Sequence, residues 1–123
     1  MSYQIGQKEE VVRKFSHQDI VAYRRLAAND LSNEPSTEER LLVPNSLLGA
    51  IFSYLLGTKL PGLGAIYLKQ SFNFLKDVYQ DQEITGTVEI IAVKPEKGII
   101  TFRTTCVVDG ELVCEGEALI MKK

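Results

Sequence analysis

The sequence predicts an α+β protein in which a curved antiparallel sheet wraps around one central apolar helix. Two observations predict this architecture. The stretch 41–58 is uncharged and strongly apolar, and after Gly64 the hydrophobic periodicity changes from helical to alternating. A chain of 123 residues, with 45% hydrophobic and 24% charged residues, has the size and balance of one globular domain spanning 1–123.

The first elements are a short strand and a helix. The segment Glu9–Phe15 predicts the strand, and Ser16 then opens the helix, because its hydroxyl can cap the free amides of the first turn. Asp19 lies three residues further on, near the positive end of the helix dipole. The polar stretch 29–40 indicates a loop.

The central helix follows this loop. Asn45 is expected to cap it, and Gly57 with the Pro61-Gly62 pair to end it. Its apolar side chains form a stripe wide enough to be buried on most sides: Leu47, Leu48, Ile51, Phe52, Leu55 and Leu56.

Four antiparallel strands are expected in the second half. The first is a long half-buried strand, because apolar and polar residues alternate from Ile66 to Phe74. The others are Glu83–Val93, Ile99–Val108 and Leu112–Met121, separated by turn residues. Such a sheet leaves its edges open, so we predict a homodimer in which two sheets join edge to edge.

The register of the last hairpin follows from its alternation. Even-numbered residues of both strands are expected on the core face, so paired residue numbers must have an even sum. A two-residue loop at Asp109-Gly110 gives an odd sum and places Glu115 and Glu117 in the core, so we predict a three-residue loop with Gly110 in a bulge. The predicted core face is Ile100, Phe102, Thr104, Cys106 and Val108 opposite Leu112, Cys114, Gly116, Ala118 and Ile120.

Composition excludes several partners and cofactors. The 14 basic and 16 acidic residues give a formal net charge of -2, which leaves no positive surplus for a nucleic acid backbone. Pro44 shortens the apolar helix too much for a membrane span, and the charged start Met1–Lys14 predicts a cytoplasmic protein. Cys106 and Cys114 are interpreted as buried reduced thiols. With one histidine, His17, expected at the exposed start of the first helix, no metal or cofactor is predicted.

Several segments resemble a known family. The run from Leu55 to Ser71, LLGTKLPGLGAIYLKQS, followed by Phe74 and Val78-Tyr79, is similar to the MaoC-like (R)-specific enoyl-CoA hydratases of the hot-dog fold. The segments 15–20 and 109–118 resemble that family's opening helix and last hairpin. The resemblance covers the chain from Ile5 to Met121 and implies a hot-dog fold.

The resemblance also implies a chemistry, but its central motif is altered here. Family members hydrate a trans-2-enoyl thioester to an (R)-3-hydroxyacyl thioester, with the Asp and His of an Asp-x-Asn-Pro-x-His motif as the acid–base pair. The corresponding segment, 29–37, reads NDLSNEPST. Asp30 takes the place of the catalytic Asp, whereas Pro35, or Ser36 or Thr37 after a shift by one residue, stands where the His is required.

Other site residues are implied around the central helix. The resemblance places the backbone amide of Asn45 where the family aims a glycine amide at the thioester oxygen, at a helix end that favours negative charge. It also places Ser53, with Phe52 and Leu48, along the acyl-binding site. For Ser53 an alternative is a hydrogen bond back to the carbonyl of Gly49.

Three functions therefore stay open. The first is a binding protein for acyl-CoA or acyl-carrier thioesters with impaired hydratase activity. The second is an active enoyl-CoA hydratase or 3-hydroxyacyl dehydratase that uses Asp30 with a substitute such as Glu34. The third is a non-catalytic subunit of a hetero-oligomeric dehydratase. We favour the first, because loss of one member of an acid–base pair typically costs about two to four orders of magnitude in rate.

Overall fold

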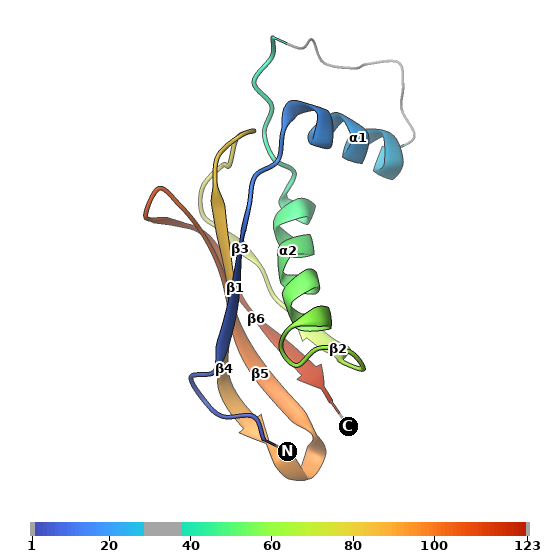
Figure 1. The fold of residues 1–123 in the computed structure, drawn as a ribbon, viewed down its shortest axis with the longest axis vertical. Helices are drawn as coiled ribbons and strands as arrows, with labels where there is room; N and C mark the ends of the chain where they lie inside the picture. Colours follow the sequence, from blue (N-terminus) through green and yellow to red (C-terminus); the bar gives the residue numbers. More distant parts are fainter. Residues whose placement is uncertain (1, 29–37, 123) are drawn as a thin grey trace.

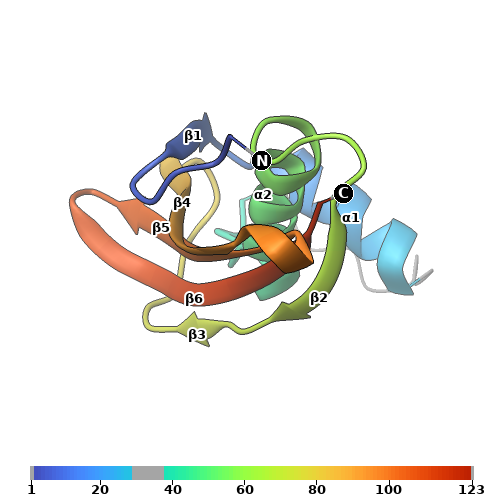
Figure 2. The same ribbon diagram turned by 90° about the horizontal axis from the view of Figure 1, so that it is seen from below.

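The computed structural model describes residues 2–28 and 38–122, which form one curved antiparallel sheet around a helix (Figure 1). The strands pair in the order β1-β4-β5-β6-β2, and β3 also pairs with β6. Figure 2 shows how the sheet curls around α2, as the sequence predicts. The elements are β1 (Lys8–Arg13), α1 (His17–Ala28), α2 (Asn45–Thr58), β2 (Ile66–Gln70), β3 (Asn73–Phe74), β4 (Ile84–Lys94), a short 3-10 helix (Pro95–Lys97), β5 (Ile99–Val108) and β6 (Glu111–Met121).

The core lies between α2 and the concave face of the sheet. Five apolar side chains of α2 are buried there, and each contributes about 1.5–3 kcal/mol. Gly86 of β4 allows the helix to come close, since a Cβ at this position would lie 2.3 Å from Cγ2 of Ile51. No helix in residues 2–28 and 38–122 is long and apolar enough to span a membrane. The buried α2 side chains are Leu48, Ile51, Phe52, Leu55 and Leu56.

The two helices begin differently. At α1, the Ser16 amide donates to Oδ2 of Asp19 at 2.9 Å and the Asp19 amide donates to Oγ of Ser16 at 3.1 Å, which is a capping box. At α2, the predicted cap is wrong: Pro44 is the N-cap, and Asn45 is the first helical residue. Pro44 has no amide to satisfy, and its carbonyl accepts the Leu47 amide at 2.9 Å.

The predicted long strand at 66–74 is only partly correct. Gln70 pairs with Ala118 and Asn73 with Glu115, so β2 and β3 share one register and are interrupted between them. A β-bulge between Tyr67 and Lys69 shifts the register within β2. The side chains of β2 and β3 are mostly exposed rather than half-buried, because these strands form an edge of the sheet.

The predicted three-residue loop in the last hairpin is wrong. Val108 pairs with Glu111, so the loop has two residues, Asp109 and Gly110, with φ of 51° and 76°. These values are typical of a type I′ turn. A β-bulge next to Cys106 and Val107 then restores the even register.

The predicted core face is largely confirmed despite the different turn. Cys106 lies directly opposite Cys114, and both are free, buried cysteines. Leu112 and Gly116 are half-buried, whereas Val113, absent from the predicted face, joins the core. His17 is half-buried at the start of α1, not exposed as expected.

Candidate functional site

The predicted site residues fall into three groups. Asn45 and Ser53 are exposed residues of α2. Leu48 and Phe52, predicted to line the acyl site, are instead in the core with 1% and 0% of their surface exposed. The helix turns both side chains toward the sheet, and their contact with an acyl group stays a prediction. Asp30, like Glu34, lies outside the described residues.

A surface between α2 and β2 connects the exposed residues. We call Gly49, Ser53, Tyr67 and Phe72 the α2–β2 surface. The Phe72 ring stacks on Phe52 at a centroid distance of 6.3 Å, so Phe52 supports this surface from below. A Cβ on Gly49 would lie 3.2 Å from Cζ of Phe72, which shows how closely the ring lies against the helix. The centre of the surface is therefore aromatic.

The polar part of the α2–β2 surface is a pair of hydroxyl groups. Tyr67 Oη donates to Ser53 Oγ at 3.5 Å, a long contact of the kind that often shortens when a ligand binds. Burial raises the pKa of Tyr67, and the hydrogen bond to Ser53 opposes this shift. The phenol is thus neutral and able to donate near pH 7. The partner of the Ser53 hydroxyl is Tyr67, and not the Gly49 carbonyl considered above.

Sequence reasoning missed Tyr67. Simple alternation places it with Lys69 on the solvent face of a strand. In the structure Tyr67 pairs with Ile120, a core residue, and therefore lies on the core face of the strand. The extra residue at the bulge leaves Lys69 on the opposite face. Bulges commonly redirect a side chain in this way. Hydrophobic periodicity contains no signal for such an extra residue.

The second polar feature is the N-terminus of α2. The helix has no side-chain cap, and of its first-turn amides the Leu47 amide donates to the Pro44 carbonyl at 2.9 Å. The first amides of a helix otherwise have no carbonyl partner within it. Ser46 Oγ is hydrogen-bonded to Tyr23 Oη, which connects α1 to this end of α2. Amides at a helix N-terminus favour a partly negative oxygen. This end of α2 can therefore bind an oxygen acceptor such as a carbonyl.

The two polar features are well separated. Ser53 follows Asn45 by eight residues, which corresponds to about 12 Å along the helix axis. Gly49 lies halfway, under the Phe72 ring. The arrangement suits an extended ligand with a polar head at the helix end and an apolar chain along the helix.

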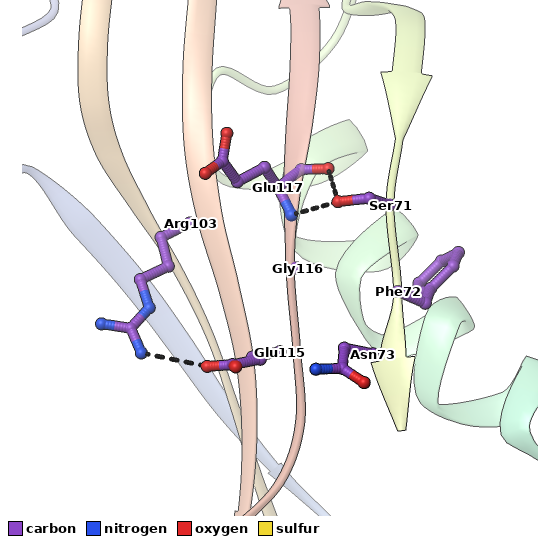
Figure 3. Close-up of a pocket in the computed structure, with 7 residues that line it drawn as sticks. All are labelled: Ser71, Phe72, Asn73, Arg103, Glu115, Gly116 and Glu117. Carbon is purple, nitrogen blue, oxygen red and sulfur yellow. Dashed lines mark hydrogen bonds and ion pairs between the residues drawn. The ribbon is translucent and has the colours of Figure 1, made fainter. Parts of the chain in front are cut away.

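A cavity lies between β5, β6 and the segment that joins β2 to β3, and it has a different character (Figure 3). It measures about 380 Å³, and its polar groups are largely paired with one another. Arg103 forms an ion pair with Glu115 at 3.4 Å, and the Glu117 amide donates to Oγ of Ser71 at 3.0 Å. Arg103 and Glu117 are exposed on the face away from α2. Phe72, which also belongs to the α2–β2 surface, is the apolar side chain in its lining. The lining residues are Ser71, Phe72, Asn73, Arg103, Glu115, Gly116 and Glu117.

Comparison with known proteins gives similarities over almost the full chain. No protein-family model matches the sequence. The chain is 38% identical to an (R)-specific enoyl-CoA hydratase of Rhodospirillum rubrum over 123 residues, covering 94% of this chain and 85% of that protein. It is 35% identical to an (R)-specific enoyl-CoA hydratase of Aeromonas caviae over 127 residues, covering 97% and 95%. The solved (R)-hydratase from A. caviae involved in PHA biosynthesis has a TM-score of 0.86 at 32% identity, covering 99% and 98% of the two chains.

Proposed function

The chain belongs to the (R)-specific enoyl-CoA hydratase family, with its hot-dog fold, and we propose that it is an acyl-thioester binding protein whose hydratase activity is impaired. The observation that carries this proposal is the segment 29–37, in which Asp30 is present and no histidine follows. Hydration requires a base and an acid within reach of both reacting carbons. Ser36 and Thr37 are not bases near neutral pH.

The binding half of the proposal is supported by α2. The uncapped helix end at Asn45 suits the thioester oxygen, since its amides and dipole favour developing negative charge. The α2–β2 surface supplies an apolar path from this end for an acyl chain. The ligand is an acyl group on CoA or on an acyl carrier.

We further propose that two copies of the chain form a homodimer through β2. The sheet has two edges, and β1 exposes mainly charged residues. β2 instead exposes Ile66 and Leu68, which are 53% and 44% accessible. Exposed apolar edges favour pairing with another strand, whereas charged edges oppose it.

The test is hydration of crotonyl-CoA, followed by the loss of enoyl-thioester absorbance. Wild type is compared with Asp30→Asn and with a variant that restores the family motif, Ser32→Asn/Asn33→Pro/Pro35→His. We expect slow or undetectable turnover in wild type and a gain of about two to four orders of magnitude in the restored variant. Thermal shifts with crotonyl-CoA on the same samples measure binding, which stabilises by about 2.7 kcal/mol at a ligand concentration 100 times Kd.

Two other results would support a different function, and a third would reject the proposed one. Rapid wild-type turnover that Asp30→Asn abolishes would establish an active hydratase with a substitute group, and Glu34→Gln would then test the substitute. Co-purification with a related chain that supplies the missing histidine would establish a non-catalytic subunit. Absence of any thermal shift with acyl-CoA would reject the binding function.

A further inference from the structure

We propose that Ser53, positioned by Tyr67, selects acyl groups that carry an uncharged oxygen acceptor on the acyl chain, far from the thioester. The inference rests on the proposed binding of acyl thioesters along α2. It adds a substrate class, oxygenated acyl groups, and a positioning residue, Tyr67.

In the hydrogen bond between the two hydroxyl groups, Tyr67 is the donor. A serine hydroxyl has one proton to donate and two lone pairs that accept. Ser53 Oγ already accepts from Tyr67 Oη, so its own proton is directed elsewhere. Ser53 is exposed, so a ligand atom can accept this proton. The ligand atom is therefore an acceptor, such as a hydroxyl or carbonyl oxygen.

Ser53 lies far from the N-terminus of α2. Ser53 is about 12 Å along the helix from Asn45, and this is about the length of an extended decanoyl chain. One carbonyl cannot reach both positions. If the thioester oxygen binds at Asn45, the hydroxyl pair faces the far part of the acyl chain. Gly49, with the Phe72 ring against it, lies between them and provides an apolar stretch.

Tyr67 brings a polar group to the α2–β2 surface. The bulge between Tyr67 and Lys69 places the phenol on the helix side, opposite Ile120. A plain apolar chain would gain more from an aliphatic residue at this place, because an unmatched polar group loses hydrogen bonds to water when a ligand covers it. A site built to hydrogen-bond a substrate oxygen discriminates against the analogue that lacks it. The hydroxyl pair thus favours an oxygenated chain.

The experiment compares matched ligands. The Kd of butanoyl-, decanoyl- and hexadecanoyl-CoA is measured by calorimetry against that of the corresponding ω-hydroxyacyl-CoA. The proteins are wild type, Tyr67→Phe, Ser53→Ala and the double variant. Tyr54→Phe is the matched control, because Tyr54 is also an exposed tyrosine beside Ser53, but its ring contacts Arg13 instead.

We expect wild type to bind ω-hydroxydecanoyl-CoA about two- to tenfold more tightly than decanoyl-CoA, which corresponds to one neutral hydrogen bond. The preference is smaller for the shorter and longer chains. Tyr67→Phe and Ser53→Ala each remove it, the double variant loses no more than either, and Tyr54→Phe retains it. A purely structural role of Tyr67 would weaken both ligands equally and leave their ratio unchanged.

Two results would overturn the inference. Equal affinity for hydroxylated and plain chains at every length in wild type is one, and a preference that survives Tyr67→Phe is the other. In both cases the plain acyl-CoA still binds, so the proposed function stands. Failure of every acyl-CoA to bind wild type would overturn the proposed function together with the inference.

Discussion

Gly116 is the residue on which the path of the edge strand depends. A Cβ at this position would lie 2.0 Å from the carbonyl oxygen of Ser71 and 3.4 Å from Cα of Phe72. Both are backbone atoms, which cannot move aside as a flexible side chain can. Because Gly116 has no side chain, the segment between β2 and β3 packs closely against β6, and Phe72 points toward α2.

We expect Gly116→Ala to lower the free energy of unfolding by about 1–3 kcal/mol, measured by urea denaturation, because the new methyl group overlaps the backbone of Ser71. Gly57→Ala is the control. Gly57 lies in α2 with nothing within 4 Å of the added Cβ, so its replacement should be neutral or stabilise by up to about 1 kcal/mol. Equal effects of the two substitutions would contradict this account of the edge strand.

The hairpin of β5 and β6 contains the two thiols of the core. Burial raises the pKa of Cys106 to about 12, with a smaller contribution from the neighbouring Cys114. Burial also raises the pKa of Cys114 to about 11, and Glu115 adds to this shift. In the unfolded chain both thiols titrate near the ordinary value of about 8.5. The folded protein therefore retains protons that the unfolded chain releases at alkaline pH.

This difference predicts how stability changes with pH. The contribution of the two thiols is fully present below about pH 8.5 and is lost as the pH rises toward the folded-state values, because the unfolded state then binds fewer protons. We expect the free energy of unfolding to fall between about pH 8.5 and pH 10 with a slope of up to about 1.4 kcal/mol per pH unit for each thiol. Urea unfolding at several pH values measures it.

The matched control is the Cys106→Ala/Cys114→Ala variant. It is less stable at pH 7 because of the lost volume, but the part of the pH dependence due to the thiols should disappear. The same slope in wild type and in this variant would show that other groups cause the alkaline instability.

At the level of elements, the sequence predicts best where one periodicity runs without interruption. α2 and β5 follow directly from their apolar spacing, and β5 has the predicted bounds Ile99–Val108. β2 does not, because one extra residue at its bulge exchanges the two faces of the strand. In the last hairpin two departures from the prediction cancel: a shorter turn and a bulge next to Cys106 together keep the same core face.

The candidate site shows the same limit. Ser53 could be identified through the resemblance to the family, and the structure supplies its partner, Tyr67. Tyr67 could not, because its position depends on the bulge rather than on composition or spacing. Leu48 and Phe52 lie on the same helix as Ser53, yet the turn of the helix directs them into the core. The family motif at Asp30 lies outside the described residues.

For the molecule as a whole, the two edges of the sheet give a test of the proposed homodimer. Leu68 in β2 and Val12 in β1 are similarly exposed, at 44% and 50%. We expect Leu68→Lys to convert the dimer to a monomer, because it places charge in an apolar contact, and Val12→Lys to leave the dimer intact. Sedimentation velocity of both variants measures the result. A dimer that Val12→Lys breaks and Leu68→Lys does not would place the contact at β1.

In the proposed homodimer, the charged β1 edge limits the addition of further chains. A symmetric contact uses the same strand of both partners, so joining through β2 leaves one β1 at each outer end of the combined sheet. These ends expose Lys8, Glu9, Glu10 and Arg13, whose hydration opposes the addition of a third chain. In the proposed homodimer, growth is therefore expected to stop at two chains, so that ribbons or fibrils do not form.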